Sequence, residues 1–81
     1  MSDPLKTKAA LLNADLDNGH RFANVVHYLQ ASGWNLRTKG SHRIFTRPGV
    51  PTLLNLQPES SGKAKAYQIR QLRRTIIQFN L

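Results

Sequence analysis

Trp34-Asn35-Leu36-Arg37-Thr38-Lys39-Gly40-Ser41-His42-Arg43-Ile44-Phe45-Thr46-Arg47 is the segment that decides the fold. Its pattern predicts two short strands joined at Gly40-Ser41, because a type II′ hairpin turn requires glycine in its first central position. In a hairpin with a two-residue turn, residues at equal distances from the turn pair across the strands. The predicted pairs are Lys39 with His42, Arg37 with Ile44, Leu36 with Phe45, and Trp34 with Arg47.

This pairing separates apolar from basic side chains, because paired residues share a face of a sheet. One face carries the apolar side chains of Trp34, Leu36 and Phe45. The opposite face carries Arg37, Lys39 and His42. Histidine is the side chain that gains and loses protons near neutral pH. The second face therefore places a proton carrier beside two fixed cations, which suits chemistry on a phosphodiester.

The composition limits the class of protein. A chain of 81 residues predicts one domain, residues 1–81, with a modest core and a function carried on its surface. It has no cysteine, which excludes disulfides, zinc-thiolate sites and thiol nucleophiles. No apolar run reaches membrane-spanning length, and residues 1–13 lack the uninterrupted apolar centre of a signal peptide. We expect a cytoplasmic protein without membrane contact.

Charge is distributed unevenly along the chain. Twelve Lys and Arg against four acids give a net charge of +8. Residues 1–18 hold two lysines and three aspartates, or −1, whereas residues 19–81 hold ten basic residues and only Glu59, or +9. Such a basic region favours a polyanion, most simply nucleic acid, because each neutralised phosphate releases counterions. Improved solubility or docking onto an acidic protein is the alternative explanation.

Two helices are predicted before the hairpin. Ser2-Asp3-Pro4 offers an oxygen-bearing cap before a proline at the first helical position. The first helix is expected to end near Asn13, with an apolar stripe of Leu5, Ala9, Leu12 and Leu16. A polar connection over residues 15–19 leads to a second helix over residues 21–32, which Gly33 stops. Its apolar stripe is Phe22, Val25, Val26 and Leu29.

One strand and one helix are predicted after the hairpin. A turn over residues 48–51 precedes a strand over residues 52–57, which Pro58 closes. A flexible loop over residues 59–62 leads to a helix over residues 66–79, with Ile69, Leu72, Ile76 and Phe79 on its apolar side. The element order indicates an α+β fold with helices on one face of an antiparallel sheet. We interpret Trp34, Phe45 and Phe79 as core, and leave Tyr67 undecided.

Several short motifs occur together in this chain: Gly33-Trp34 after a predicted helix, Lys39-Gly40-Ser41-His42 at the predicted hairpin, Ile44-Phe45, a Pro-Gly turn, and the segments 54–58 and 62–72. Together they resemble the HicA family of toxin components in type II toxin-antitoxin systems. The resemblance is to a longer HicA-like subgroup and covers residues 20–78. It leaves residues 1–18 as an N-terminal helical extension.

The resemblance implies a double-stranded-RNA-binding-domain-like fold and the activity of an mRNA interferase, an endoribonuclease that a HicB antitoxin holds inactive. In that family the activity depends on the histidine of the Gly-Ser-His motif. His42 is thereby implied to be the catalytic group, and Gly40 and Ser41 to fix the turn before it. Compact members carry a second histidine shortly after the third strand, where this chain has Asn55-Leu56-Gln57-Pro58. We expect the free chain to be monomeric.

The chemistry of RNA cleavage assigns roles to the basic face. Neutral His42 can take the proton of a 2′-hydroxyl as general base, with Lys39, Arg37 or Arg43 stabilising the charge that develops on the phosphate. The expected products are a cyclic phosphate and a free 5′-hydroxyl, with a lysine or water protonating the leaving oxygen. We expect no metal and no other cofactor, because two-metal catalysis needs clustered carboxylates and the basic region has only Glu59.

A second candidate site lies at the entry to the last helix. Lys63 and Lys65 precede its first turn, where the helix dipole favours acids, and exposed amides beside two lysines can hold a phosphate of RNA. A flexible loop that bears lysines is an equal explanation. Arg70, Arg73 and Arg74 either extend this RNA-binding track or are simply solvated. We interpret His20 and His27 as a helix-end group and a solvated residue without catalytic tasks.

Two other functions remain open. The chain can be a non-catalytic RNA-binding module on the same fold, in which case RNA binding depends steeply on salt and no cleavage occurs. Alternatively, it is an adaptor whose basic face docks an acidic partner protein. Saturable binding of such a partner without RNA affinity is the result that distinguishes the adaptor.

Overall fold

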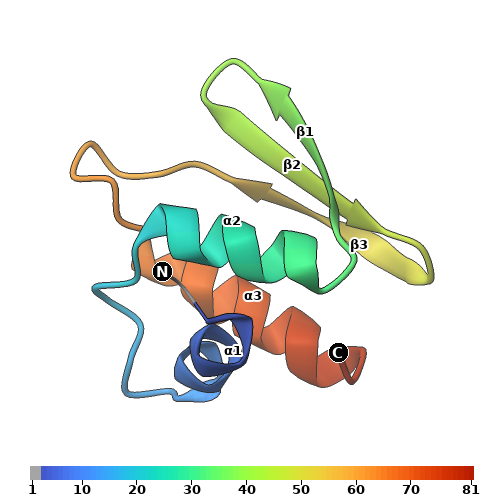
Figure 1. The fold of residues 1–81 in the computed structure, drawn as a ribbon, viewed down its shortest axis with the longest axis horizontal. Coiled ribbons are helices and arrows are strands. Elements are labelled where there is room, and N and C mark those ends of the chain that lie inside the picture. Colours follow the sequence, from blue (N-terminus) through green and yellow to red (C-terminus); the bar gives the residue numbers. More distant parts are fainter. Residues whose placement is uncertain (1–2) are drawn as a thin grey trace.

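The computed structural model describes residues 3–81, and its elements follow the predicted order. A three-stranded antiparallel sheet has the strand order β1-β2-β3. Figure 1 shows this sheet on one side of the molecule and the helices on the other. The prediction of a small α+β fold is confirmed. The elements are α1 (Pro4–Leu12), α2 (Phe22–Ala31), β1 (Asn35–Lys39), β2 (His42–Arg47), β3 (Val50–Leu56) and α3 (Ala66–Gln78).

The β1–β2 hairpin has the predicted register. Its pairs run from Lys39 with His42 to Asn35 with Thr46, so three of the predicted pairs are confirmed. Gly40 has a φ of +60°, whereas the φ of Ser41 is not positive. This combination is typical of a type II′ turn. The predicted pair of Trp34 with Arg47 is not formed, because β1 begins at Asn35 and Arg47 pairs with Val50 instead.

The third strand begins earlier than predicted, at Val50 rather than at residue 52. Its pairing with β2 shifts register between Phe45 and Arg47, so β3 carries a bulge. A bulge leaves a residue outside the regular ladder, and this tolerates Pro51, which has no backbone N–H to donate. Beyond the bulge, Phe45 pairs with Leu54, Ile44 with Asn55, and Arg43 with Leu56.

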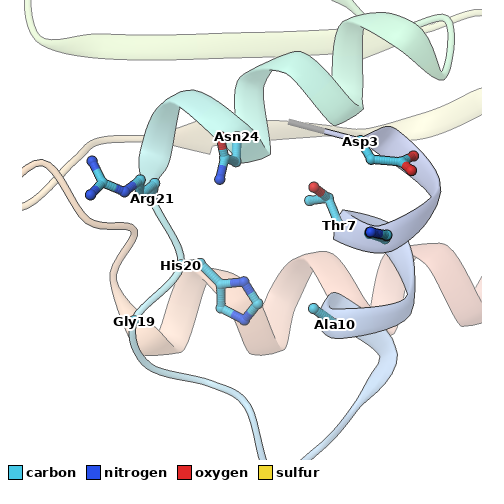
Figure 2. A pocket seen from close by; sticks show the side chains of 8 residues that line it. Asp3, Thr7, Ala10, Gly19, His20, Arg21 and Asn24 are labelled. Carbon is cyan, nitrogen blue, oxygen red and sulfur yellow. The ribbon is translucent and has the colours of Figure 1, made fainter. Parts of the chain in front are cut away.

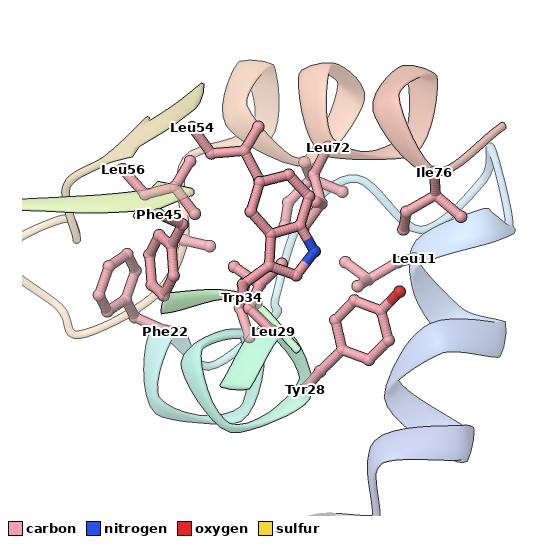
Figure 3. Close-up of a cluster of buried hydrophobic side chains, with 13 residues drawn as sticks. Leu11, Phe22, Tyr28, Leu29, Trp34, Phe45, Leu54, Leu56, Leu72 and Ile76 are labelled. Carbon is pink, nitrogen blue, oxygen red and sulfur yellow. The ribbon is translucent and has the colours of Figure 1, made fainter. Parts of the chain in front are cut away.

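The core lies between the sheet and the helices (Figure 3). Trp34 and Phe45 are buried as predicted. Phe79 is only half-buried, because α3 ends at Gln78 and Phe79 forms its C-cap. Tyr28, which lies outside the predicted stripe of α2, is buried as well, and this burial raises the pKa of its phenol. The fully buried large side chains are Leu11, Val25, Leu29, Phe45, Leu54, Leu56, Ile69 and Leu72.

The first helix is capped as predicted but buries a different face. Asp3 accepts a hydrogen bond from the Leu5 amide at 3.0 Å, and Pro4 occupies the first turn; Ser2 lies outside the described residues. The predicted apolar stripe is wrong, because Leu5 is 79% exposed and Leu11 is fully buried. Figure 3 shows Leu11 pointing from α1 toward Tyr28 and Ile76, which α2 and α3 supply.

A partly buried arginine of α3 holds the C-terminal end of α1. Arg73 donates to the carbonyl oxygens of Leu11 at 2.6 Å and Asn13 at 2.9 Å, and to the carboxylate of Asp17 at 2.6 Å. The carbonyls at the end of a helix have no partner within the helix. Arg73 therefore supplies donors that α1 lacks and joins its end to α3.

The segment before α3 forms a closed turn rather than an open loop. The Gly62 amide donates to the Glu59 carbonyl at 2.9 Å, and Glu59 donates to Lys63 at 2.8 Å. This turn is also tied to the start of α2, because Phe22 donates to Gly62 at 3.0 Å. The entry points of α2 and α3 are therefore fixed to each other by backbone hydrogen bonds.

Candidate functional site

The candidate site lies on the side of the sheet that faces away from the helices, which we call the open face. Strand alternation assigns residues to it, because Phe45, Leu54 and Leu56 point into the core and their neighbours point outward. The strands contain no Asp or Glu, so the open face combines cations with neutral groups. Its side chains come from Asn35, Arg37, Lys39, His42, Ile44, Thr46, Leu53 and Asn55.

His42 and Asn55 meet on this face. The Nδ1 atom of His42 lies 3.0 Å from Oδ1 of Asn55, and both side chains are exposed. An amide oxygen can only accept a hydrogen bond, so Nδ1 is the donor and carries the proton. In the neutral ring the lone pair then resides on Nε2. The contact thus selects the tautomer in which Nε2 can accept a proton from a ligand.

Asn55 is not among the site residues predicted from the sequence. Alternation between Leu54 and Leu56 predicts that Asn55 points outward, and this signal was available. The approach of Asn55 to His42 additionally depends on the register between β2 and β3, in which Asn55 pairs with Ile44, two residues along from His42. That register follows from the bulge and cannot be derived from turn length alone.

Two of the three predicted cations lie beside His42. Lys39 pairs directly with His42 across the hairpin, and Arg37 pairs with Ile44 on the same face. Both side chains are exposed. Arg43 is different, because it pairs with Thr38 and Leu56 and so extends from the opposite face. The grouping of Arg43 with His42 is therefore corrected: the next residue along a strand points to the other side.

The turn residues Gly40 and Ser41 are exposed and precede His42 at one end of the sheet. Because Arg43 pairs with Leu56, the segment that follows β3 lies at this same end. Lys63 in that segment is exposed and forms an antiparallel bridge with Arg21. These two residues, with Gly19, Ala23, Ser61 and Gly62, line a hollow of about 370 Å³. Sequence reasoning did not anticipate that Arg21 joins Lys63.

Lys65 is the N-cap residue of α3 and is half-buried, without a side-chain cap hydrogen bond. The buried Ala64 separates it from Lys63, and the Ala64 amide donates to the His20 carbonyl at 2.8 Å. The predicted pair of lysines is therefore present at the entry to α3. The two differ in exposure, and Lys63 is the more accessible one.

The arginines of α3 are not equivalent. Arg73 is used within the fold, and Arg70, whose side chain is 52% exposed, lies 3.4 Å from the same carboxylate of Asp17. The hydrogen bond from Arg73 holds the pKa of Asp17 below its usual value, and Arg70 adds to the effect. Arg74 is exposed. Of the predicted arginine track, Arg74 is thus the cation most available to a ligand.

A separate hollow of about 400 Å³ lies between α1 and the start of α2 (Figure 2). Figure 2 shows the His20 ring in this space. The Nε2 atom of His20 donates to the carbonyl oxygen of Leu16, so this hydrogen bond lies within the connection between α1 and α2. The lining includes both Asp3 and Lys6, so the hollow lacks the single sign of charge found on the open face. His27 is exposed on α2.

Within residues 3–81, no helix is long and apolar enough to cross a membrane. The same residues contain no group of three or more His, Cys, Asp or Glu side chains that could hold a metal ion. Tyr67, at the start of α3, is exposed.

Comparisons with protein-family models, curated proteins and solved structures found no match to this chain. The open face therefore provides the observations from which a function can be proposed.

Proposed function

We propose that this protein is a metal-independent endoribonuclease that uses His42 as its general base. One observation carries the proposal: on a sheet face with cations and no carboxylates, Asn55 binds Nδ1 of His42 at 3.0 Å and leaves Nε2 as the acceptor. The ring is exposed, so a phosphodiester can reach it. Because Nδ1 is already held by Asn55, ring rotation is also restricted.

The reaction follows from the ligand's own 2′-hydroxyl. Nε2 of His42 takes the proton of this hydroxyl while its oxygen attacks the adjacent phosphorus in line. A bond forms between O2′ and phosphorus, and the bond from phosphorus to O5′ breaks. The products are a 2′,3′-cyclic phosphate and a strand with a 5′-hydroxyl, whose oxygen receives a proton from water or from Lys39.

The cations beside His42 would stabilise the charge on the phosphate oxygens. Lys39 lies directly opposite His42. Arg37 lies on the same face, two residues before Lys39 in β1. Such preorganised positive groups favour the transition state over the ground state where they meet charge that builds up during attack. Lys63, Lys65 and Arg74 would hold the strand further along, by contacts that depend on phosphates rather than on bases.

The wider biological role in this proposal comes from the resemblance to the HicA family. We assign the chain a double-stranded-RNA-binding-domain-like fold and the role of a toxin that cleaves mRNA in the cytoplasm. An acidic HicB-like antitoxin is the partner in this assignment. The α+β architecture with helices on one sheet face and the His42 hairpin at its predicted register support it.

The test is cleavage of an unstructured RNA by purified protein in the presence of EDTA. The His42→Ala variant should cleave about 100- to 10,000-fold more slowly, the usual contribution of a general base. A His27→Ala variant, which removes an exposed histidine of α2, should retain wild-type activity. An RNA whose 2′-hydroxyls are replaced by hydrogen should resist cleavage. Equal rates for wild type and His42→Ala would reject the proposed base.

A non-catalytic RNA-binding module is the second candidate. It is favoured by the presence of only one histidine and no carboxylate among the described strands, because a second titratable group normally protonates the leaving oxygen. In that case RNA binds with steep salt dependence and stays intact. Persistent binding without cleavage under all metal-free conditions would select this candidate.

A further inference from the structure

A hollow of about 450 Å³ lies on the open face next to His42. Its lining comprises Asn35, Leu36, Arg37, Ile44, Thr46 and Leu53. Ile44 is two residues from His42 along β2, and both side chains point outward. Two residues of a strand span about 6.8 Å. The hollow therefore begins one side-chain row away from the imidazole.

Two outward-facing apolar side chains, Ile44 and Leu53, line this hollow, and we call them its apolar floor. Leu53 is 54% exposed, and Ile44 is half-buried. Leu53 lies in the part of β3 that bulges against β2, so the sheet is locally uneven there. An exposed leucine is common by itself. Here, however, Leu53 lines a hollow together with Arg37 and with Asn35 and Thr46, two polar residues that pair across the strands.

We infer that this hollow binds the base of the nucleotide adjacent to the phosphate held at His42. The inference rests on the proposed function. A nucleobase has apolar faces and polar edges, so its face can cover Ile44 and Leu53 while Asn35 and Thr46 hydrogen-bond to its edge. Arg37 pairs with Ile44 and can stack on the base or contact the next phosphate, as its planar guanidinium allows.

Charge and position favour a nucleotide over other occupants. The open face carries Arg37 and Lys39 and no acid, so the surroundings of the hollow attract phosphates. The hollow also lies one same-face row away from His42, because its lining includes Arg37 and Ile44, the pair that follows Lys39 and His42 on this face. Its volume falls within the usual range of small-ligand pockets, about 300–1,000 Å³. Such a subsite would give the nuclease a preference for the base next to the cut.

The test measures RNA binding in a His42→Ala background, in which cleavage does not interfere. The probe is a single-stranded hexaribonucleotide, compared with the same strand carrying one abasic position. Leu53→Asn removes the apolar floor, and Ile77→Asn is the matched control because Ile77 is 65% exposed on α3, outside the sheet. Leu53→Asn should weaken binding of the intact strand about fivefold, and Ile77→Asn should leave it unchanged.

The abasic strand separates a base contact from a phosphate contact. With the Leu53 side chain present, scanning the abasic position should reveal one position at which affinity falls by a similar factor; with Leu53→Asn this penalty should disappear. Equal affinities of the Leu53→Asn and Ile77→Asn proteins for intact RNA would overturn the base subsite, while His42-dependent cleavage in the separate assay would leave the nuclease standing. Binding of an acidic leucine-containing peptide, but not of RNA, through Leu53 would overturn both.

Discussion

Replacing Leu11 by alanine tests whether α1 belongs to the core or is merely appended to it. The resemblance described from the sequence covers residues 20–78 and predicts that residues 1–18 are an extension. In the structure, however, Leu11 is fully buried and points toward Tyr28 and Ile76 (Figure 3). Removing a fully buried leucine side chain loses its transfer free energy and leaves a cavity, and such substitutions cost about 2.7–5 kcal/mol.

This loss is large relative to the stability of the whole domain. A domain of 81 residues has a free energy of unfolding of about 4–12 kcal/mol. For this size, each kcal/mol shifts Tm by about 4–8 °C, so Leu11→Ala should lower Tm by at least about 10 °C. The matched control is Leu5→Ala in the same helix, where the side chain is 79% exposed and the expected change is within about 0.5 kcal/mol.

Both variants are measured by thermal unfolding and by urea unfolding, with far-ultraviolet circular dichroism as the readout. The unfolding transition of Leu11→Ala should remain single and move to lower temperature and urea concentration. A loss no greater than that of Leu5→Ala would refute the assignment of Leu11 to the shared core. It would also indicate that residues 20–78 fold without help from α1.

Three further predictions concern single contacts. Asn55→Leu should lower kcat about five- to tenfold at unchanged KM, because one hydrogen bond to the His42 ring is lost. In this variant ¹⁵N NMR of the His42 imidazole should show a mixture of tautomers. A pure Nδ1–H tautomer in the variant would contradict the role of Asn55. Gly40→Ala should lower the free energy of unfolding, measured with urea, by about 1–2 kcal/mol. Gly40 has a φ of +60°, and no neighbouring atom lies within 4 Å of an added Cβ, so the cost comes from the backbone conformation alone. An unchanged urea midpoint would exclude the type II′ turn. Because the pKa of Asp17 is lowered in the folded protein, its contact with Arg73 stabilises the fold at pH values above 3.8, the usual pKa of the side chain. This contribution to stability is lost as pH falls through the folded pKa. Asp17→Asn should therefore flatten the loss of stability between neutral and acidic pH, and parallel pH profiles for the two proteins would contradict the contact.

The hairpin could be predicted from the sequence because its determinants are local. Gly40-Ser41 selects the turn, the turn selects the register, and the register brings Arg37, Lys39 and His42 to one face. The buried Trp34 and the helix stop at Gly33, which has a φ of +92°, follow from equally short-range patterns.

The remaining features depend on contacts between distant segments. Alternative helical stripes on α1 contain either Leu11 or Leu12, and only packing against α2 and α3 decides between them. Arg73 looked like a candidate for RNA binding, yet it is committed to Asp17 and the end of α1. Asn55 meets His42 because of a bulge that inserts residues into β3, and no local rule of turn chemistry fixes its position.

The sheet has two edges, β1 and β3, each with backbone groups that a second chain could pair with. Edge strands of this kind invite aggregation unless charge, proline or irregularity blocks the approach of another strand. β1 carries Arg37 and Lys39, and β3 carries Pro51 and the bulge. Arg37 and Lys39, which we propose bind RNA, should thus also hinder pairing between copies of the chain, so neutralising them should lower solubility as well as nucleic-acid affinity.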